Sequence, residues 1–256
     1  MLKYRFAKLE DVVPIKNLLE KNDLPIDGVE RHFKDFIVVE NNAVLIGAVG
    51  LEIYEKSALF RSLVVDQKYR SENVGKLLIE RIKAHALLNG VKYFYLLTTA
   101  ARDYFLQLGF IEMERDQAPQ EILITKEFQN LCPSTATCLK LNIENQVQYY
   151  PKDILKLKPA IKGAKMWAVS LQKTMFTYFE AEPNCIFEKH SHESEQITFV
   201  FEGKLYFELH DEVKCVSAGE SIAIPSNVPH AVFTKDEKVI AVDAWSPIME
   251  KYRYAL

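Results

Sequence analysis

The chain has 256 residues and a formal net charge of −3, and 48% of its residues are hydrophobic and 26% charged. These values are typical of globular proteins and exclude a disordered, collagen-like or low-complexity chain. The slightly acidic balance argues against a broad electrostatic contact with nucleic acid. No apolar stretch has membrane-spanning length, the first residues do not resemble a signal peptide, and four cysteines are too few for a disulfide framework. We therefore expect a cytoplasmic protein with neither a membrane nor a nucleic-acid partner.

The first part of the chain alternates helical and strand-like segments. In chain order, hydrophobic periodicity predicts a helix after Asp11, strands over 35–40, 43–54 and 57–66, a helix over 73–88, a strand over 91–97, a helix over 101–108 and a strand over 110–115. Interleaved helices and strands of this kind form a mixed α/β layer arrangement. We therefore expect an α/β domain over residues 1–143.

The second part of the chain has the pattern of an all-β domain. Short apolar runs bounded by Gly, Pro, Asn and Asp predict strands over 174–181, 196–202, 204–210, 220–224, 229–234 and 238–245. Many short strands at regular spacing indicate a sandwich or a barrel. The polar stretch 144–160 carries prolines and fits neither pattern, so we expect a linker there and a second domain over 161–256.

The turn between the strand at 57–66 and the helix at 73–88 is a candidate pyrophosphate cradle. A helix N-terminus presents unpaired backbone N–H groups and the positive end of the helix dipole. Glycine permits a close backbone approach, and basic side chains add positive charge. The residues of this candidate cradle are Arg70, Ser71, Asn73, Val74, Gly75 and Lys76.

This turn, written Arg70-x-x-Asn73-x-Gly75 after a Val-rich strand, resembles the acyl-CoA-binding motif of the GNAT N-acetyltransferases. Asn73 takes the place of the family's first glycine and also tolerates a left-handed backbone. The resemblance implies a mixed-sheet GNAT fold, acetyl-CoA as the cofactor and a small-molecule amine as the substrate. It also implies that the strand backbone at Leu63 and Val65 pairs with the pantetheine arm.

Other segments extend the resemblance over most of the first domain. The sequence ARDYFLQLGF at 101–110 resembles the family's helix and Gly-Phe pair. Resemblance to the N-acetyltransferases encoded beside arsenic-resistance genes is carried by the segments 51–63, 95–110 and 128–138. Many GNAT enzymes have a tyrosine general acid four residues before the Gly-Phe pair, where this chain has Phe105. Its neighbour Tyr104 is a candidate, although adjacent helical residues point about 100° apart.

Two charged residues are further candidates for catalysis. Strand alternation over 57–65 predicts that Arg61 shares a face with Leu63 and Val65. If that face binds CoA, Arg61 could hold an anionic substrate, and Glu52 on the preceding strand could accept the proton of the amine. The alternative is that Glu52 and Arg61 form a cross-strand ion pair with a structural role. Both interpretations stay open.

The second domain carries a histidine pattern with metal-ligand spacing. His190 and His192 would point to the same face of a strand, and Gln196 follows four residues later. A third histidine, His230, comes from a distant strand after the pattern Gly-x5-Pro-x-Asn-x2. The spacing within both parts resembles the two motifs of the cupin family, with Gln196 in place of the usual glutamate.

The cupin resemblance implies a jelly-roll barrel with a metal held by His190, His192, Gln196 and His230. Three imidazoles favour zinc, nickel, iron, copper or manganese over calcium or magnesium. A neutral amide ligand leaves the ion its full positive charge and strengthens its polarisation of a bound carbonyl or water. Cupins with a glutamine ligand and a later Asp-x-Phe/Trp-x-Pro strand, matched at 243–247, resemble the pectin-degradation type. That type has an arginine where this chain has Met249, so we do not carry over its lyase activity.

We interpret the chain as an acetyl-CoA-dependent N-acetyltransferase of a small amine, fused to a metal-binding cupin. One alternative is a small-ligand binding or sensor protein whose acetyltransferase half is degenerate. Another makes the cupin the enzyme, acting on a small sugar or keto acid. A homodimer is compatible with each interpretation.

Overall fold

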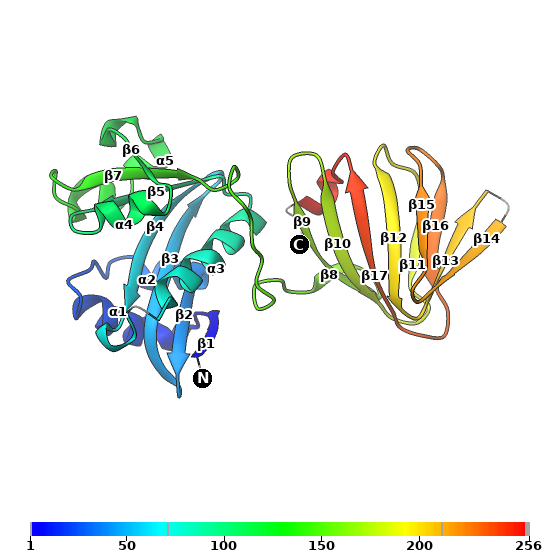
Figure 1. Ribbon diagram of the computed structural model, residues 1–256, viewed down its shortest axis with the longest axis horizontal. Coiled ribbons are helices and arrows are strands. Elements are labelled where there is room, and N and C mark those ends of the chain that lie inside the picture. Colours follow the sequence, from blue (N-terminus) through cyan, green and yellow to red (C-terminus); the bar gives the residue numbers. More distant parts are fainter. Residues whose placement is uncertain (1, 71, 211, 254–256) are drawn as a thin grey trace. The chain divides into compact units, whose positions relative to one another are not determined.

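The computed structural model describes residues 2–70, 72–210 and 212–253 and divides into two compact units, one up to Ile154 and one from Leu155 onward (Figure 1). Each unit encloses a hydrophobic core of its own. Between β7 (Thr137–Asn142) and β8 (Lys158–Ile161), residues 143–157 form turns and contain no helix or strand. Within the described ranges, no helix combines the length and the apolar character needed to cross a membrane.

Among the described residues, the first unit is built on a seven-stranded sheet in the order β1-β2-β3-β4-β5-β7-β6. The other strands of this sheet are β1 (Leu2–Phe6), β2 (Phe36–Asn41), β3 (Val44–Tyr54), β4 (Ser57–Val65), β5 (Tyr93–Thr98) and β6 (Ile111–Glu112). Neighbouring strands are antiparallel except β4 and β5, which run parallel. The mixed sheet confirms the predicted α/β class.

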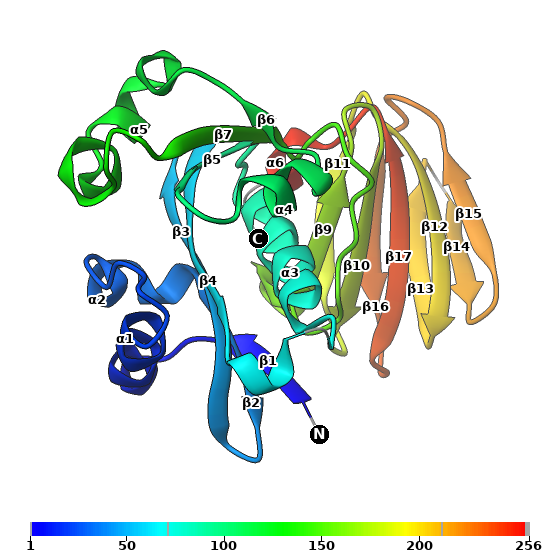
Figure 2. The same cartoon turned by 60° about the vertical axis from the view of Figure 1, so that its left-hand side comes forward.

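Helices cover both faces of this sheet (Figure 2). One face carries α3 (Val74–Leu88) and α4 (Arg102–Gln107), and the other carries α1 (Val12–Glu20), α2 (Val29–His32), α5 (Gln120–Leu123) and a π-helical turn (Glu127–Leu131). Leu78 of α3 packs in one cluster with Leu51 of β3, whereas Leu19 of α1 packs in another with Val38 of β2. Burial of apolar side chains on both faces fixes the position of β4 in the middle of the sheet.

A bulge at Ser62 divides β4 into two parts. The register of β4 against β3 shifts there by one residue, so that Arg61 and Val64, rather than Arg61 and Leu63, share a face. Ser62 has a φ of 58°, an unusual left-handed conformation for a strand residue. Leu63 and Val65 pack toward α3, whereas Arg61 faces α2. The prediction that Arg61 shares a face with Leu63 and Val65 is wrong, because a bulge adds one residue to a strand and inverts the alternation beyond it.

Strands β4 and β5 separate halfway along their length. They pair as far as Leu59 and Tyr95, after which β5 continues along β7 to Thr98 while β4 continues along β3 to Val65. Among the described strands, none pairs with the backbone of residues 60–65 on the side of β5. Unpaired strand backbone can bond an extended amide chain as it would bond a further strand.

The second unit consists of two sheets packed face to face (Figure 1). In the part of the chain that the structure describes, one sheet has six strands in the order β15-β12-β17-β10-β9-β8, and the other has four in the order β11-β16-β13-β14. The strands are β9 (Ala164–Ser170), β10 (Met175–Ala181), β11 (Ile186–His190), β12 (Glu195–Glu202), β13 (Lys204–Leu209), β14 (Glu212–Ser217), β15 (Ser221–Ile224), β16 (His230–Thr234) and β17 (Val239–Ser246), followed by α6 (Glu250–Arg253).

Apolar side chains from both sheets, such as Phe179 on β10 and Phe207 on β13, fill the space between them. This arrangement is consistent with the predicted jelly roll and confirms the all-β class of the second half. The described strands form two separate sheets rather than one closed barrel.

Candidate functional site

The first candidate site lies where β4 leads into α3. Asn73, the N-cap of α3, has a φ of 59°, which is the left-handed conformation that favours glycine. The first helical hydrogen bond is donated by the backbone N–H of Leu77 to the carbonyl of Asn73 at 3.0 Å. The N–H groups of Val74, Gly75 and Lys76 therefore precede the hydrogen bonds of the helix. These N–H groups fit a pyrophosphate. The unpaired backbone of β4, where it separates from β5, fits an extended chain of amides such as the pantetheine arm of CoA.

The structure describes two of the other three predicted cradle residues, Arg70 and Lys76. The guanidinium of Arg70 donates hydrogen bonds to Asn22 Oδ1 at 2.6 Å and to the carbonyl of Val65 at 3.2 Å. Arg70 thus connects the end of β4 to the loop after α1. Lys76 is exposed on the first turn of α3, and Ser71 lies outside the described residues.

Tyr104 lies beside this cradle and not beside Glu52. A Cβ added to Gly75 would stand 3.5 Å from the Tyr104 hydroxyl, which is ordinary van der Waals distance. Tyr104 is 41% exposed, and partial burial raises the pKa of its hydroxyl. Its neighbour Phe105 is buried and packs against Phe60 with ring centroids 5.8 Å apart. The side chain at the family's usual tyrosine position is therefore part of the core and has no proton to give.

A buried charged cluster occupies the opposite face of β4. Arg61, whose side chain is 2% exposed, donates a hydrogen bond from Nη1 to Glu52 Oε1. Its Nη2 is ion-paired with Glu127 Oε1 at 3.2 Å, but this buried donor has no hydrogen-bond partner among the described residues. We call Glu52, Arg61 and Glu127 the acceptor cluster. The cluster places two carboxylates around one guanidinium. It contains the ion pair between Glu52 and Arg61 that was one of two interpretations of the sequence.

Polar neighbours complete the acceptor cluster. The Tyr54 hydroxyl donates to Glu52 Oε2 at 2.9 Å, and His32 Nε2 lies 3.7 Å from the same oxygen. A Cβ added to Gly28, just before α2, would meet Arg61 Nη1 at 3.0 Å and Glu52 Oε1 at 3.1 Å. The loop before α2 therefore packs its backbone against the ion pair. Glycine suits this position on two grounds, because its φ of 80° is left-handed and a Cβ would be crowded by the ion pair.

Glu127 is the member of the cluster that sequence reasoning missed. It lies in the π-helical turn, 66 residues beyond Arg61 in the chain, and no local pattern marks it. Burial raises the pKa of its carboxyl, the guanidinium of Arg61 opposes this shift, and the charge of Glu52 adds to it. A carboxylate with a raised pKa is a better proton acceptor than an exposed one.

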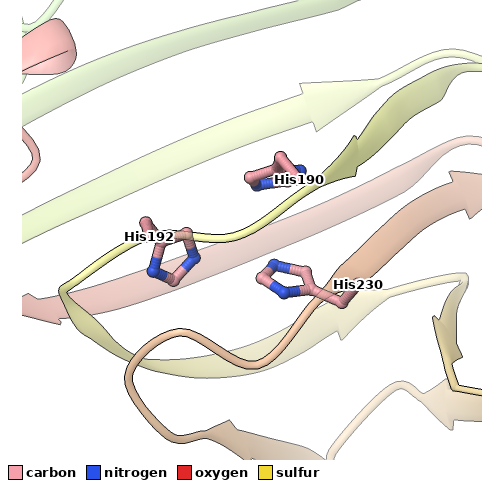
Figure 3. A group of neighbouring side chains, drawn as sticks. All are labelled: His190, His192 and His230. Atoms are coloured by element: carbon pink, nitrogen blue, oxygen red, sulfur yellow. The ribbon is translucent and has the colours of Figure 1, made fainter.

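The second candidate site is the histidine cluster of the cupin unit (Figure 3). Nitrogen atoms of His190, at the end of β11, His192, just after it, and His230, at the start of β16, all lie within 4.8 Å of one another. His190 pairs directly with His230 across the two strands. Figure 3 shows the three rings gathered around one space.

Hydrogen bonds fix the tautomer of all three rings. Each Nδ1 faces a backbone carbonyl: that of Glu188 for His190 at 2.7 Å, that of Ser194 for His192 at 2.7 Å, and that of Val228 for His230 at 2.8 Å. Because a carbonyl only accepts, each Nδ1 carries the hydrogen and each Nε2 presents a lone pair. Burial lowers the pKa of His190 and of His230, which favours the neutral form. The Nε2 atom of His230 is buried without a partner among the described residues.

Gln196 joins this cluster from β12. Its Oε1 lies 3.2 Å from His192 Nε2. Both atoms are acceptors in the neutral tautomer described above, so a cation bound by both would make their approach favourable. The four predicted ligands are thus brought together with their lone pairs facing one space, and the donor set fits a transition metal.

Comparison with known proteins identifies both halves. The family model described as an acetyltransferase (GNAT) domain matches residues 32–112, and the one described as a cupin domain matches residues 177–245. An uncharacterised N-acetyltransferase from Chlorobaculum tepidum is 30% identical over 114 residues, which cover 44% of this chain and 71% of that protein. The chain therefore belongs to the GNAT acetyltransferase family, and its second half contains a cupin domain.

Two further relatives match the first unit. The amino-acid acetyltransferase of Photorhabdus laumondii is 31% identical over 151 residues, which cover 56% of this chain and 33% of that protein. The structure of N-acetylglutamate synthase from Neisseria gonorrhoeae, complexed with coenzyme A and N-acetyl-glutamate, has a TM-score of 0.50 and 19% identity and covers 56% of this chain and 35% of that chain. This chain thus spans about a third of each of these two proteins, and the structural likeness shows a shared fold.

Proposed function

We propose that the first unit transfers the acetyl group of acetyl-CoA to the amine of a small, amino-acid-like molecule. The observation that carries the proposal is the position of the acceptor cluster: it lies on the face of β4 opposite the cradle, next to the point where β4 and β5 separate. A donor bound along one side of the opening and an amine bound on the other would meet there. The names of the curated relatives, which include amino-acid acetyltransferases, support the same substrate class.

The cradle would hold acetyl-CoA through backbone groups. The N–H groups of Val74, Gly75 and Lys76 suit its pyrophosphate, and the free backbone of β4 at Leu63 and Val65 suits its pantetheine amides. When bound, acetyl-CoA supplies an activated thioester carbonyl. Alignment of this carbonyl with the amine accounts for much of the rate in reactions of this type.

The acceptor cluster is complementary to a zwitterion. Glu52 and Glu127 suit an ammonium group, and Arg61 Nη2, which is ion-paired with Glu127 but makes no hydrogen bond, suits a carboxylate oxygen. An ammonium must lose a proton before its nitrogen can attack the thioester, and a carboxylate of the cluster would take that proton. Breaking the C–S bond then releases CoA as a thiolate. Because free thiols have a pKa of about 8.5, this leaving group needs little help from a general acid, which agrees with Phe105 at the usual tyrosine position.

The proposal is tested with a panel of acceptors that differ in one group. Wild-type protein and acetyl-CoA are incubated with amino acids, with the amines left when the carboxylate is removed, and with N-methylated amino acids. We expect mass spectrometry to find acetylated product with amino acids, and much less with the decarboxylated amines. Acetylation that ignores the carboxylate would contradict the zwitterion part of the proposal, and no acetylation of any amine would contradict the activity itself.

We further propose that the cupin unit binds one divalent transition metal through His190, His192, Gln196 and His230. The facing acceptor atoms of Gln196 and His192, and the unpartnered Nε2 of His230, support a bound cation. Zinc, nickel, iron, copper and manganese are all compatible with three imidazoles and an amide. Such an ion polarises a bound carbonyl or water, so a small keto acid or sugar is the class of ligand to test in this unit.

A further inference from the structure

Asp243, on β17, is buried among the polar groups behind the histidine cluster and is not itself a predicted ligand. It stands directly opposite Thr198 of β12 on one side and Thr177 of β10 on the other. Its Oδ1 accepts a hydrogen bond from Thr198 Oγ1 at 2.6 Å, and its Oδ2 accepts one from Thr177 Oγ1 at 3.2 Å. These bonds hold the carboxylate in one orientation across three strands.

The same carboxylate accepts a hydrogen bond from the amide nitrogen of Gln196. Gln196 Nε2 lies 3.0 Å from Asp243 Oδ1 and 3.0 Å from Thr198 Oγ1. In a glutamine amide only the nitrogen carries hydrogens, so it is the nitrogen that must face these two acceptors. The amide oxygen must then point the other way, and it lies 3.2 Å from His192 Nε2, at the metal site.

Asp243 and Thr198 contribute unequally to this orientation. The hydroxyl of Thr198 has one hydrogen, which it donates to Asp243 Oδ1, so toward the amide it only accepts; without that carboxylate it could bond either end. An ionised carboxylate only accepts, so turning the amide over would set Gln196 Oε1 against Asp243 Oδ1, two acceptors with no hydrogen between them. Asp243 therefore distinguishes the two ends of the amide directly and, by taking the hydrogen of Thr198, also through that hydroxyl.

We propose that Asp243 is a positioning residue that fixes the side chain of Gln196 so that its oxygen, and not its nitrogen, faces the metal. This inference rests on the proposed metal site. It also bears on the expectation from sequence that a neutral amide ligand leaves the ion its full positive charge, because a carboxylate stands directly behind the amide. An acceptor behind a ligand's N–H also makes the ligand a better electron donor.

The test compares Asp243→Asn with Thr198→Val as its matched control. Asparagine has the size of aspartate but can bond either end of the amide, whereas Thr198→Val removes one partner and leaves the carboxylate. Zinc affinity is measured by competition with a chelator, and the coordination of Co²⁺ is followed by its visible absorption. We expect Asp243→Asn to weaken zinc binding by about 10–100-fold and to change the Co²⁺ spectrum, as is typical for loss of a group that orients a ligand. Thr198→Val should retain the wild-type spectrum.

A second variant covers the case in which Asp243→Asn does not fold. In the double variant Gln196→Glu/Asp243→Asn, the carboxylate becomes the ligand and the asparagine amide becomes its donor, so we expect metal binding to return. The proposal is overturned if Asp243→Asn binds zinc within about twofold of wild type with the same Co²⁺ spectrum while Gln196→Ala binds more weakly.

If wild-type protein binds neither ion, the metal site itself is wrong. Hydrogen exchange of the Gln196 side-chain NH₂, measured by NMR without metal, then decides the orientation: slow exchange that Asp243→Asn accelerates supports it, and equal exchange overturns it.

Discussion

Arg61 and Leu63 are two positions apart on β4, yet they lie on opposite faces of the sheet because of the bulge at Ser62. Leu63 lies on the face of α3, whose N-terminus forms the cradle, and Arg61 lies on the face of α2 and the π-helical turn. A strand with regular alternation would have put both on one face. The bulge therefore gives the proposed donor and acceptor sites separate sides of one strand.

Gly75→Glu should weaken acetyl-CoA binding. A glutamate on the first turn of α3 would bring negative charge to the N–H groups that suit the pyrophosphate. Gly75→Ala is the control, since its Cβ would stand 3.5 Å from the Tyr104 hydroxyl and fits without a clash. We expect calorimetry to show at least a tenfold weaker affinity, about 1.4 kcal/mol, for Gly75→Glu and a near-normal affinity for Gly75→Ala. Equal affinities for both variants would place the cofactor elsewhere.

Arg61→Lys should separate recognition of the carboxylate from binding of the cofactor. Lysine keeps the charge within the acceptor cluster but cannot reach two groups with one planar fork. We expect the KM for amino acids to rise about tenfold and the KM for acetyl-CoA to stay constant. An amine without a carboxylate is the matched substrate. If its KM rises as much as that of the amino acid, Arg61 serves only the ion pair with Glu52.

Glu127→Gln should remove the decrease of kcat/KM at low pH. The carboxylate must be ionised to take a proton, and burial raises its pKa above the ordinary value of 4.5. In wild-type protein kcat/KM should therefore fall as the pH decreases through this raised pKa, whereas at higher pH the base is fully available. The glutamine variant should be slower by about 10²–10⁴-fold and lack this decrease. A variant with an unchanged profile would show that Glu127 does not act as the base.

His230→Ala should lose metal more completely than Gln196→Ala. His230 is a strong imidazole donor, buried at the centre of the cluster, whereas Gln196 contributes a weaker neutral oxygen. Since the imidazoles bind metal only when neutral, and burial lowers the pKa of His190 and His230, wild-type protein should keep its metal at pH 7 and release it on acidification. Elemental analysis measures how much metal the purified wild type and each of the two variants retain. A wild type that contains no metal and takes up none of zinc, nickel or manganese would refute the site.

Sequence periodicity predicted the main elements of both units but missed four strands: β1, β7, β8 and β9. Two of them, β1 and β8, end a sheet, whereas β7 and β9 pair on both sides. Edge strands pair on one side only and carry many charged side chains, as β1 does with Lys3 and Arg5, so they lack the alternation of apolar residues that marks a central strand. The histidines were found because the spacing of metal ligands is local in the chain, apart from His230.

The charged part of the candidate site was harder to predict, for two physical reasons. The bulge is made by Ser62 in a left-handed conformation, and serine gives no signal of it. Glu127 meets Arg61 only after the chain has passed through β5, α4 and β6, so the contact depends on tertiary structure alone. The pairing of Gln196 with Asp243 is of the same kind, because it depends on the register of β12 against β17.

The most direct test of the central claim is the release of CoA from acetyl-CoA, followed with a thiol reagent in the presence and absence of an amino acid. We predict that the amino acid increases the rate of release by wild-type protein, that Gly75→Glu shows no such increase, and that the released thiol equals the acetylated amine formed. Release that is the same with and without amine, or that persists in Gly75→Glu, would contradict acetyl transfer at the cradle of α3.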